Sequence, residues 1–235
     1  MNDKAPNISI DAQSLSKQFD FGDQRIAVLN DVTFRIAQGD FVVILGSSGA
    51  GKTTLLNLIG GLDRPTSGTI TVDGTDLAGL DEEALSSFRS SHIGFIFQTY
   101  NLISTLTALE NIQFPMKLAG CEDESLIESR STDLLKLVGL THRSDHLPFQ
   151  MSCGEQQRAA IARALANDPP LILADEPTGN LDWSTGLEII NFLKKLSTEQ
   201  QKTMVIVTHD ERIVELADVT LKLNNGKMTE VAKPS

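Results

Sequence analysis

The sequence has no long apolar run and no recognisable export signal. Its longest apolar runs, such as FVVIL at residues 41–45, fall far short of the roughly 20 residues that a membrane-spanning helix needs. The opening stretch MNDKAPNISI contains no apolar core of signal-peptide length. We therefore expect a chain that carries no secretion signal and does not span a bilayer alone.

Cysteine and basic residues are also scarce. Cys121 and Cys153 are the only two cysteines, and they match neither a disulfide framework nor a clustered zinc site. This favours a reducing compartment such as the cytoplasm. The formal net charge is -11, whereas surfaces that bind nucleic acid need clustered Lys and Arg. We expect no nucleic-acid partner and interpret the acidity as an aid to solubility.

The hydrophobic pattern at the start of the chain predicts two kinds of sheet. Residues 7–20 and 27–37 alternate apolar and polar side chains, which predicts half-buried antiparallel strands. Residues 41–45 form an unbroken apolar run that is followed by glycines and then by helix-forming residues. This order predicts a buried strand, a turn and a helix, the opening of a parallel α/β core.

The rest of the chain predicts a core interrupted by helices. Helical spacing runs from about 107 to 166, where Thr107 and Glu110 have the spacing of a capping box. Further strands are predicted at 66–74, 93–98, 171–175 and 204–209, with a helix at about 184–198. We find no internal repeat, low-complexity segment or linker, so we expect one continuous domain.

The strongest chemical signal is GSSGAGKT at Gly46–Thr53, which matches the Gly-x-x-x-x-Gly-Lys-Ser/Thr phosphate loop between a strand and a helix. Glycines let such a loop wrap around phosphate, and the helix N-terminus adds positive potential. Lys52 would reach the β and γ phosphates, and Thr53 would offer its hydroxyl to Mg²⁺. The predicted nucleotide contacts are Gly46, Ser47, Ser48, Gly49, Ala50, Gly51, Lys52, Thr53 and Thr54.

Four polar residues lie at or directly after the carboxyl ends of predicted strands, where open α/β sheets bind their ligands. Asp175 suits coordination of Mg²⁺, and Glu176 could polarise the water that attacks the γ-phosphate. Gln98 could also approach Mg²⁺, and His209 could form a hydrogen bond with the γ-phosphate. A structural role is the alternative for a lone Gln or His at a strand end.

Residues 152–155, Ser-Cys-Gly-Glu, form a second capping box. It predicts a helix from Cys153 to the stop at residues 168–170, Asp-Pro-Pro. The predicted apolar face is Ala160, Ile161, Ala164 and Leu165, with Gln157, Arg158 and Arg163 largely off it. A free helix N-terminus with a serine and a glycine is an anion site, and a plain helix cap is the alternative.

Taken together, these residues resemble the nucleotide-binding subunits of ATP-binding-cassette (ABC) transporters over nearly the whole chain. The family usually has Leu-Ser-Gly-Gly-Gln where this chain has Met-Ser-Cys-Gly-Glu, so Cys153 stands in place of a glycine. The other matching motifs, in chain order, are the phosphate loop, Gln98 of the Q-loop, Asp175 and Glu176, Asn180-Leu181-Asp182 of the D-loop, and His209 as the switch histidine.

The resemblance implies a phosphate-loop NTPase (RecA-like) α/β core with an antiparallel β subdomain and an inserted helical subdomain. The core and β-lobe would comprise about 1–98 and 168–235, and the helical subdomain about 99–167. It also implies ATP and Mg²⁺ as cofactors, with Phe19 stacking on adenine and Phe21 as its rival. The implied catalytic residues are Glu176, His209 and Gln98, the metal ligands Thr53, Gln98 and Asp175, and the signature and D-loop contacts Ser152, Gly154, Glu155 and Asp182.

Partners follow from the same resemblance. Two copies would face head to tail, with each ATP between one copy's phosphate loop and the other's helix start at Ser152. The segments at 61–68, 101–116 and 174–182 resemble the lipoprotein-release and macrolide-export group. A separate membrane-spanning subunit would dock near Gln98 to Ala119 and hold the chain at the cytoplasmic face of the inner membrane.

Two other classes compete with this interpretation. A non-transport ABC ATPase acting on DNA or ribosomes usually carries two cassettes or a long coiled-coil insertion, and this chain has neither. A phosphate-loop kinase would leave the motif at 151–158 and the D-loop unexplained. The sequence therefore favours the transport ATPase.

Overall fold

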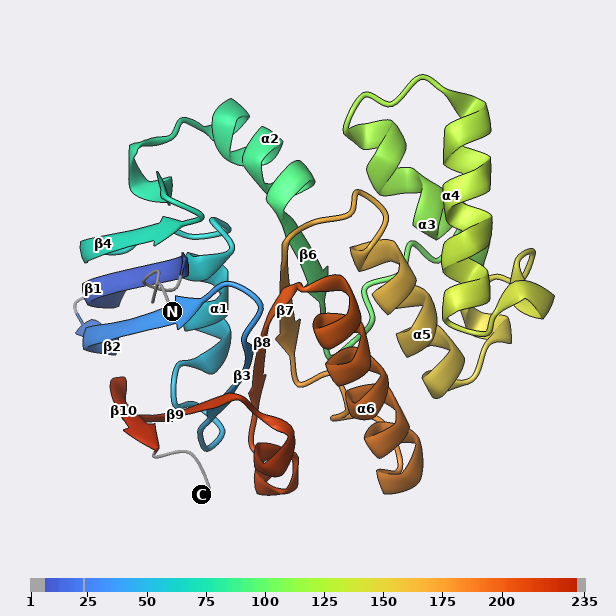
Figure 1. Cartoon of the computed structure of the whole chain (residues 1–235). Helices are drawn as coiled ribbons and strands as arrows, with labels where there is room; N and C mark the ends of the chain where they lie inside the picture. The colour runs from blue at the N-terminus through green and yellow to red at the C-terminus, as the bar shows by residue number, and fades with distance from the viewer. Residues whose placement is uncertain (1–6, 23, 232–235) are drawn as a thin grey trace, which may run out of the picture. The chain divides into compact units, whose positions relative to one another are not determined.

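The computed structural model describes residues 7–22 and 24–231 and divides into two compact units (Figure 1). Unit 1 comprises residues 1–85 and 194–235, and unit 2 comprises residues 86–193. Each unit contains α/β elements. The predicted combination of an α/β core, an antiparallel sheet and inserted helices is confirmed.

Unit 1 contains an antiparallel sheet built from the start of the chain. Its order is β2 (Gln24–Ala37), β1 (Ile8–Phe21), β4 (Ser67–Val72) and β5 (Thr75–Asp76). Along β2, the side chains of Leu29, Val32, Phe34 and Ile36 are buried among exposed neighbours. This alternation is the pattern from which the first strands were predicted, and the antiparallel pairing is confirmed.

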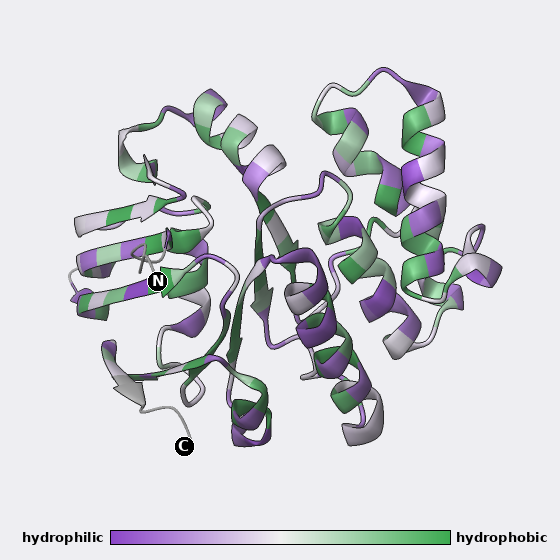
Figure 2. Cartoon of the chain, viewed as in Figure 1, coloured by the Kyte–Doolittle hydropathy of each residue, from purple (hydrophilic) through white to green (hydrophobic). Residues whose placement is uncertain are grey.

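The second group of strands in unit 1 is mostly parallel. β3 (Phe41–Leu45) lies between β9 (Val219–Asn224) and β8 (Thr203–Thr208) and is parallel to both, while β10 (Lys227–Val231) pairs antiparallel with β9. Every residue of β3 and β8 is buried, and Figure 2 shows both strands as hydrophobic ribbon. Strands covered on both faces need such continuous apolar runs.

The other elements of unit 1 connect these strands. Helix α1 (Lys52–Ile59) follows β3, the 3-10 turn η1 (Leu77–Gly79) follows β5, and η4 (Glu211–Leu216) follows β8. Within the described part of the chain, no helix combines the length and the apolar character needed to cross a membrane.

Unit 2 holds a parallel strand pair and a group of helices. The strands are β6 (Ile93–Ile96) and β7 (Leu171–Asp175). The helices are α3 (Ala108–Leu118), α4 (Glu124–Leu137) and α5 (Cys153–Ala164), with the 3-10 turns η2 (Thr141–Arg143) and η3 (Pro148–Gln150). Helix α5 packs against α3, α4 and β6. Two further helices, α2 (Glu82–His92) and α6 (Trp183–Gln200), have residues in both units.

Two details of α5 correct the predictions. The helix begins at Cys153 as predicted but ends at Ala164, before the predicted stop. Gln157, placed off the apolar face, is fully buried. That prediction was wrong because α5 is covered by two helices and a strand, so little of its circumference is left for a polar face.

A single buried side chain fixes the segment before α3. The amide nitrogen of Asn111 donates to the carbonyls of Ile103, Leu106 and Thr107 at 3.1, 3.0 and 2.9 Å. Its oxygen accepts from the Ile103 N–H at 2.8 Å. The predicted capping box of Thr107 and Glu110 is present beside it. The loop therefore depends on Asn111 for its backbone hydrogen bonds.

We predict that Asn111→Ala destabilises the protein by about 3 kcal/mol, because several buried backbone groups lose their partner. Urea unfolding measures the difference. Lys117→Ala on the same helix removes only a surface ion pair with Glu124 and should cost less than about 0.5 kcal/mol. Equal effects of the two substitutions would show that Asn111 does not support the loop.

Candidate nucleotide site

The phosphate loop and the predicted switch histidine follow the ends of two paired strands in unit 1. Leu45, the last residue of β3, pairs in parallel with Thr208, the last residue of β8. The Gly46 N–H then donates to the Thr208 carbonyl at 3.1 Å. Gly46 begins the loop, and the exposed His209 follows Thr208. The fold thus brings together two motifs that are far apart in the sequence.

The loop has the backbone of an anion cradle. Gly49 and Gly51 have φ values of 79° and 99°, in the region that favours glycine. A Cβ at Gly51 would lie 3.0 Å from the Val28 carbonyl oxygen. Gly51 is also the N-cap of α1, whose first turn contains no acidic residue. The positive end of that helix is therefore directed into a loop without competing negative charge.

Lys52 supplies a fixed cation in this loop. Its residue is only 7% exposed, and its Nζ donates to the carbonyls of Gly46 and Ser47 at 2.8 and 3.2 Å. Thr53, the next residue, is exposed. Helix dipole, backbone and ammonium therefore combine at one short segment, which is the chemistry that phosphate binding needs.

Phe19, predicted to stack on adenine, lies half-buried in β1 opposite Ile26 of β2. The Nζ of Lys17 is 4.9 Å from its ring centroid. This cation–π contact fixes a positive charge over the ring. The rival Phe21 ends β1, and its side chain lies outside the described residues.

In unit 2, the predicted Q-loop residue and the carboxylates also share a strand edge. Ile96 of β6 pairs in parallel with Ala174 of β7, so Gln98 and Asp175 leave neighbouring strand ends. Glu176 has φ 45°, a left-handed conformation that costs a non-glycine residue about 1 kcal/mol. Such strain is typical of functional positions held by their surroundings.

The D-loop contacts Gln98. The side-chain amide of Asn180 donates to the Gln98 carbonyl at 2.8 Å. A Cβ added to Gly179 would lie 2.8 Å from Gln98 Nε2, so the glutamine side chain packs on that glycine. The structure therefore joins the Q-loop and the D-loop, which were predicted as separate motifs.

The predicted helix start is an exposed, doubly capped turn. The Ser152 N–H donates to Glu155 Oε2 at 2.8 Å, and the Glu155 N–H donates to Ser152 Oγ at 3.3 Å. Ser152 and Cys153 are exposed. A Cβ at Gly154 would lie 3.0 Å from Thr185 Cγ2, so α5 begins against the start of α6. The predicted capping box is confirmed.

Asp182 of the D-loop caps α6 at this same place. Its Oδ1 accepts from the N–H groups of Ser184 and Thr185, each at 3.1 Å, and from the Ser184 hydroxyl at 2.5 Å. The Ser184 hydroxyl bond and the further bonds to the helix start hold the pKa of Asp182 well below its ordinary value. The D-loop carboxylate is therefore a fixed negative group near the start of α5.

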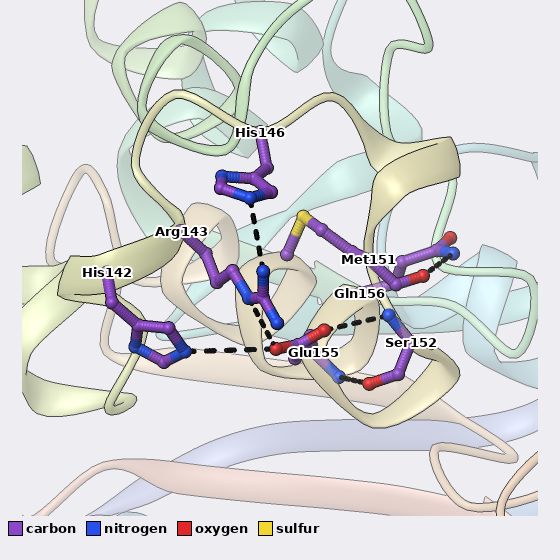
Figure 3. A network of polar contacts seen from close by, with 7 residues as sticks. All are labelled: His142, Arg143, His146, Met151, Ser152, Glu155 and Gln156. Atoms are coloured by element: carbon purple, nitrogen blue, oxygen red, sulfur yellow. Dashed lines mark hydrogen bonds and ion pairs between the residues drawn. The ribbon is translucent and has the colours of Figure 1, made fainter.

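Sequence reasoning missed the residues that surround Glu155 (Figure 3). Arg143 Nε donates to Glu155 Oε1 at 2.8 Å, and His142 Nε2 lies 3.9 Å from the same oxygen. The Ser152 backbone hydrogen bond, followed by the bond from Arg143, holds the pKa of Glu155 below its ordinary value. The available signal was an acidic residue at the family's glutamine position, with an arginine upstream.

Arg163 is a second missed residue. From the far end of α5, its guanidinium donates to the carbonyl of Tyr100 at 2.8 Å and to that of Asn101. Both residues have positive φ values, 61° and 49°. Burial, together with the neighbouring Cys153, raises the pKa of Tyr100 to about 12. The segment that follows Gln98 is therefore tied to the helix that starts at Cys153.

Comparison with known proteins identifies the family that carries this arrangement. Residues 29–179, more than half of the chain, match the family model described as ABC transporter. The chain belongs to the ABC transporter family. Its relatives place it among the ATP-binding proteins of that family, so the chain is an ABC ATPase.

Two relatives and one solved structure indicate its position within the ABC family. The lipoprotein-releasing system ATP-binding protein LolD of Bordetella pertussis is 42% identical over 227 residues, 97% of each chain. The macrolide export ATP-binding/permease protein MacB of Rhodopirellula baltica is 46% identical over 94% of this chain, which spans 32% of MacB. A dimeric ATP-binding cassette of Methanocaldococcus jannaschii, bound to ADP and Pi, is 41% identical with a TM-score of 0.90 over 96% of this chain and 99% of the other.

We predict that Gly51→Ala in this ABC ATPase weakens ATP binding at least tenfold, roughly the effect of strain and crowding in the cradle. Titration with a fluorescent ATP analogue measures it. Gly74→Ala is the matched control, because Gly74 also has a positive φ, 78°, but open space around its Cβ. The control should bind ATP like the wild type. Equal losses in both variants would mean that general destabilisation explains the effect.

We also predict that Arg163→Met speeds amide hydrogen exchange at residues 99–101 about tenfold, because the two carbonyl contacts are lost. Mass spectrometry of the exchanged protein resolves that segment. Arg158→Met, which removes the α5 contact with Glu188, should leave exchange at 99–101 unchanged. If residues 99–101 exchange at the same rate in both variants, Arg163 does not hold that segment in place.

Proposed function

We propose that this ABC ATPase powers a separate membrane subunit in an exporter or lipoprotein-release type of system. The observation that carries the proposal is the hydrogen bond from Gly46 to Thr208, which sets the phosphate loop beside His209 at one sheet edge. A group bound in the loop at this edge is also within reach of an acid–base side chain. The high identity to LolD along nearly the full length of both chains supports the choice of group.

Each residue near the nucleotide has a proposed role. The loop from Gly46 to Thr54 wraps the phosphates, and Lys52 neutralises the β and γ phosphates. Glu176 orients and polarises the attacking water, and His209 donates a hydrogen bond to the γ-phosphate. Phe19 stacks on adenine. The water's attack breaks the bond between the γ-phosphate and ADP, and releases ADP and phosphate.

The residues present suit Mg²⁺. Thr53 offers a hydroxyl, Asp175 a carboxylate and Gln98 an amide oxygen, and hard cations prefer such oxygen ligands. Within the described ranges, no group of three or more His, Cys, Asp or Glu could hold a metal by itself. When bound, Mg²⁺ neutralises charge that develops on the nucleotide phosphates.

The active form is a head-to-tail homodimer in this proposal. The helix start at Ser152 and Gly154 meets the γ-phosphate bound by the other copy, with Glu155 and Asp182 beside it. The exposure of Ser152 and Cys153 at the positive end of α5 supports this role. The similar cassette from Methanocaldococcus jannaschii is itself dimeric. Removal of the γ-phosphate then releases the two copies from one another.

The membrane subunit docks along the segment from Gln98 to Ala119. On α3, Phe114 and Leu118 are 42% and 74% exposed and lie one helical turn apart. This apolar surface supports a protein partner. We keep the division into a core of 1–98 and 168–235 and a helical subdomain of 99–167. The chain would lie peripherally at the cytoplasmic face of the inner membrane, and its net charge of -11 does not suit a DNA or RNA partner.

We predict that Glu176→Gln lowers phosphate release at least 100-fold, roughly the loss of a general base, and traps an ATP-bound dimer. Phosphate release and size-exclusion chromatography with ATP measure the two effects. Glu128→Gln, an exposed residue of α4, should behave like the wild type. A Glu176→Gln variant that hydrolyses ATP at the normal rate, or stays monomeric with ATP, would contradict the proposed mechanism.

A further inference from the structure

Glu155 presents an electrostatic problem for the proposed function. It is the third residue of α5, the helix whose N-terminus would receive a phosphate from the other copy. A carboxylate in that turn stabilises the helix dipole but repels a second anion brought to the same turn. The family's usual glutamine carries no such charge. Contacts that neutralise the carboxylate of Glu155 therefore bear on the proposed phosphate site.

The structure supplies a partner to each carboxylate oxygen. Oε2 accepts from the Ser152 N–H and Oε1 accepts from Arg143 Nε, both at 2.8 Å. The side chains of Arg143 and Glu155 are only 34% and 20% exposed. An ion pair so placed is less screened by solvent than an exposed one. Figure 3 shows the guanidinium and the helix cap on either side of the same carboxylate.

The backbone and side chain of Arg143 are held by contacts of their own. Its N–H donates to the Leu140 carbonyl at 2.8 Å, and its carbonyl accepts from the His146 N–H at 3.0 Å. Nη1 lies 3.1 Å from His146 Nε2. The His146 carbonyl in turn accepts from the Ala108 N–H at the start of α3, at 2.9 Å. The guanidinium therefore reaches Glu155 from a backbone that is fixed to a second helix.

We infer that Arg143 is a positioning residue for ATP hydrolysis: it neutralises Glu155 and holds its carboxylate on the Ser152 cap, so that the start of α5 can accept a phosphate. The inference rests on the proposed function, because it assumes that α5 meets the γ-phosphate in the dimer. Arg143 acts through Glu155, to which its guanidinium donates.

Three variants of the full-length protein test this. Arg143→Leu should lower kcat for phosphate release about tenfold, since Glu155 then keeps its charge but loses the guanidinium that neutralises it. Glu155→Gln is the reference background, because it removes the charge while a neutral amide oxygen can still accept from Ser152. In the Glu155→Gln background, adding Arg143→Leu should change kcat less than about threefold, because no charge remains to be neutralised. ATP affinity of the monomer, from analogue titration, should be unchanged in all three.

Controls separate this role from simple structural support. Lys136→Leu removes another positive charge from unit 2, one that pairs with Asp133, and should leave kcat unchanged. If Arg143→Leu proves unfolded by circular dichroism, Arg143→Lys keeps the charge and should retain at least half of the activity. The inference is overturned if Arg143→Leu is as fast as the wild type, or if adding Arg143→Leu to Glu155→Gln slows kcat as much as it does in the wild-type background. A wild-type chain that hydrolyses no ATP would overturn the proposed function, and with it the inference that rests on it.

Discussion

Parallel pairing of buried strands is the constraint on which the candidate site depends. In unit 1, β3 and β8 end side by side, and the hydrogen bond from Gly46 to Thr208 carries the register one step beyond the strands. In unit 2, β6 and β7 also end side by side, and this pairing brings Gln98 and Asp175 to neighbouring strand ends. Because the strands themselves are apolar and buried, polar chemistry is available only where the chain leaves the sheet.

Helix α5 joins the packing of unit 2 to its exposed surface. Six of its twelve residues are buried, including the polar Gln157, while its first residue, Cys153, is exposed. Arg143 fixes the first turn through Glu155, and Arg163 connects the last turn to the backbone after Gln98. Helix α5 therefore has a side-chain contact to a separate segment of unit 2 near each of its ends. Cys153 is exposed at the first turn, where the cap is formed by its neighbours.

Contiguous motifs could be predicted because their physics is local. The glycine spacing of the phosphate loop sets its backbone, and both capping boxes need only two residues three positions apart. The strands at 41–45 and 171–175 follow from unbroken apolar runs. No prediction was made for α2, β9 or β10, although β9 pairs with β3.

The sequence by itself determined the family, the phosphate loop and the order of the motifs, since these depend on residues that are close together in the chain. Only the tertiary structure decided that Gln157 is buried, that Asn180 contacts Gln98 and that Arg143 pairs with Glu155. A side chain's burial and its hydrogen-bond partner depend on which elements pack around it. Residues 82 positions apart, such as Gln98 and Asn180, meet only after that packing has formed.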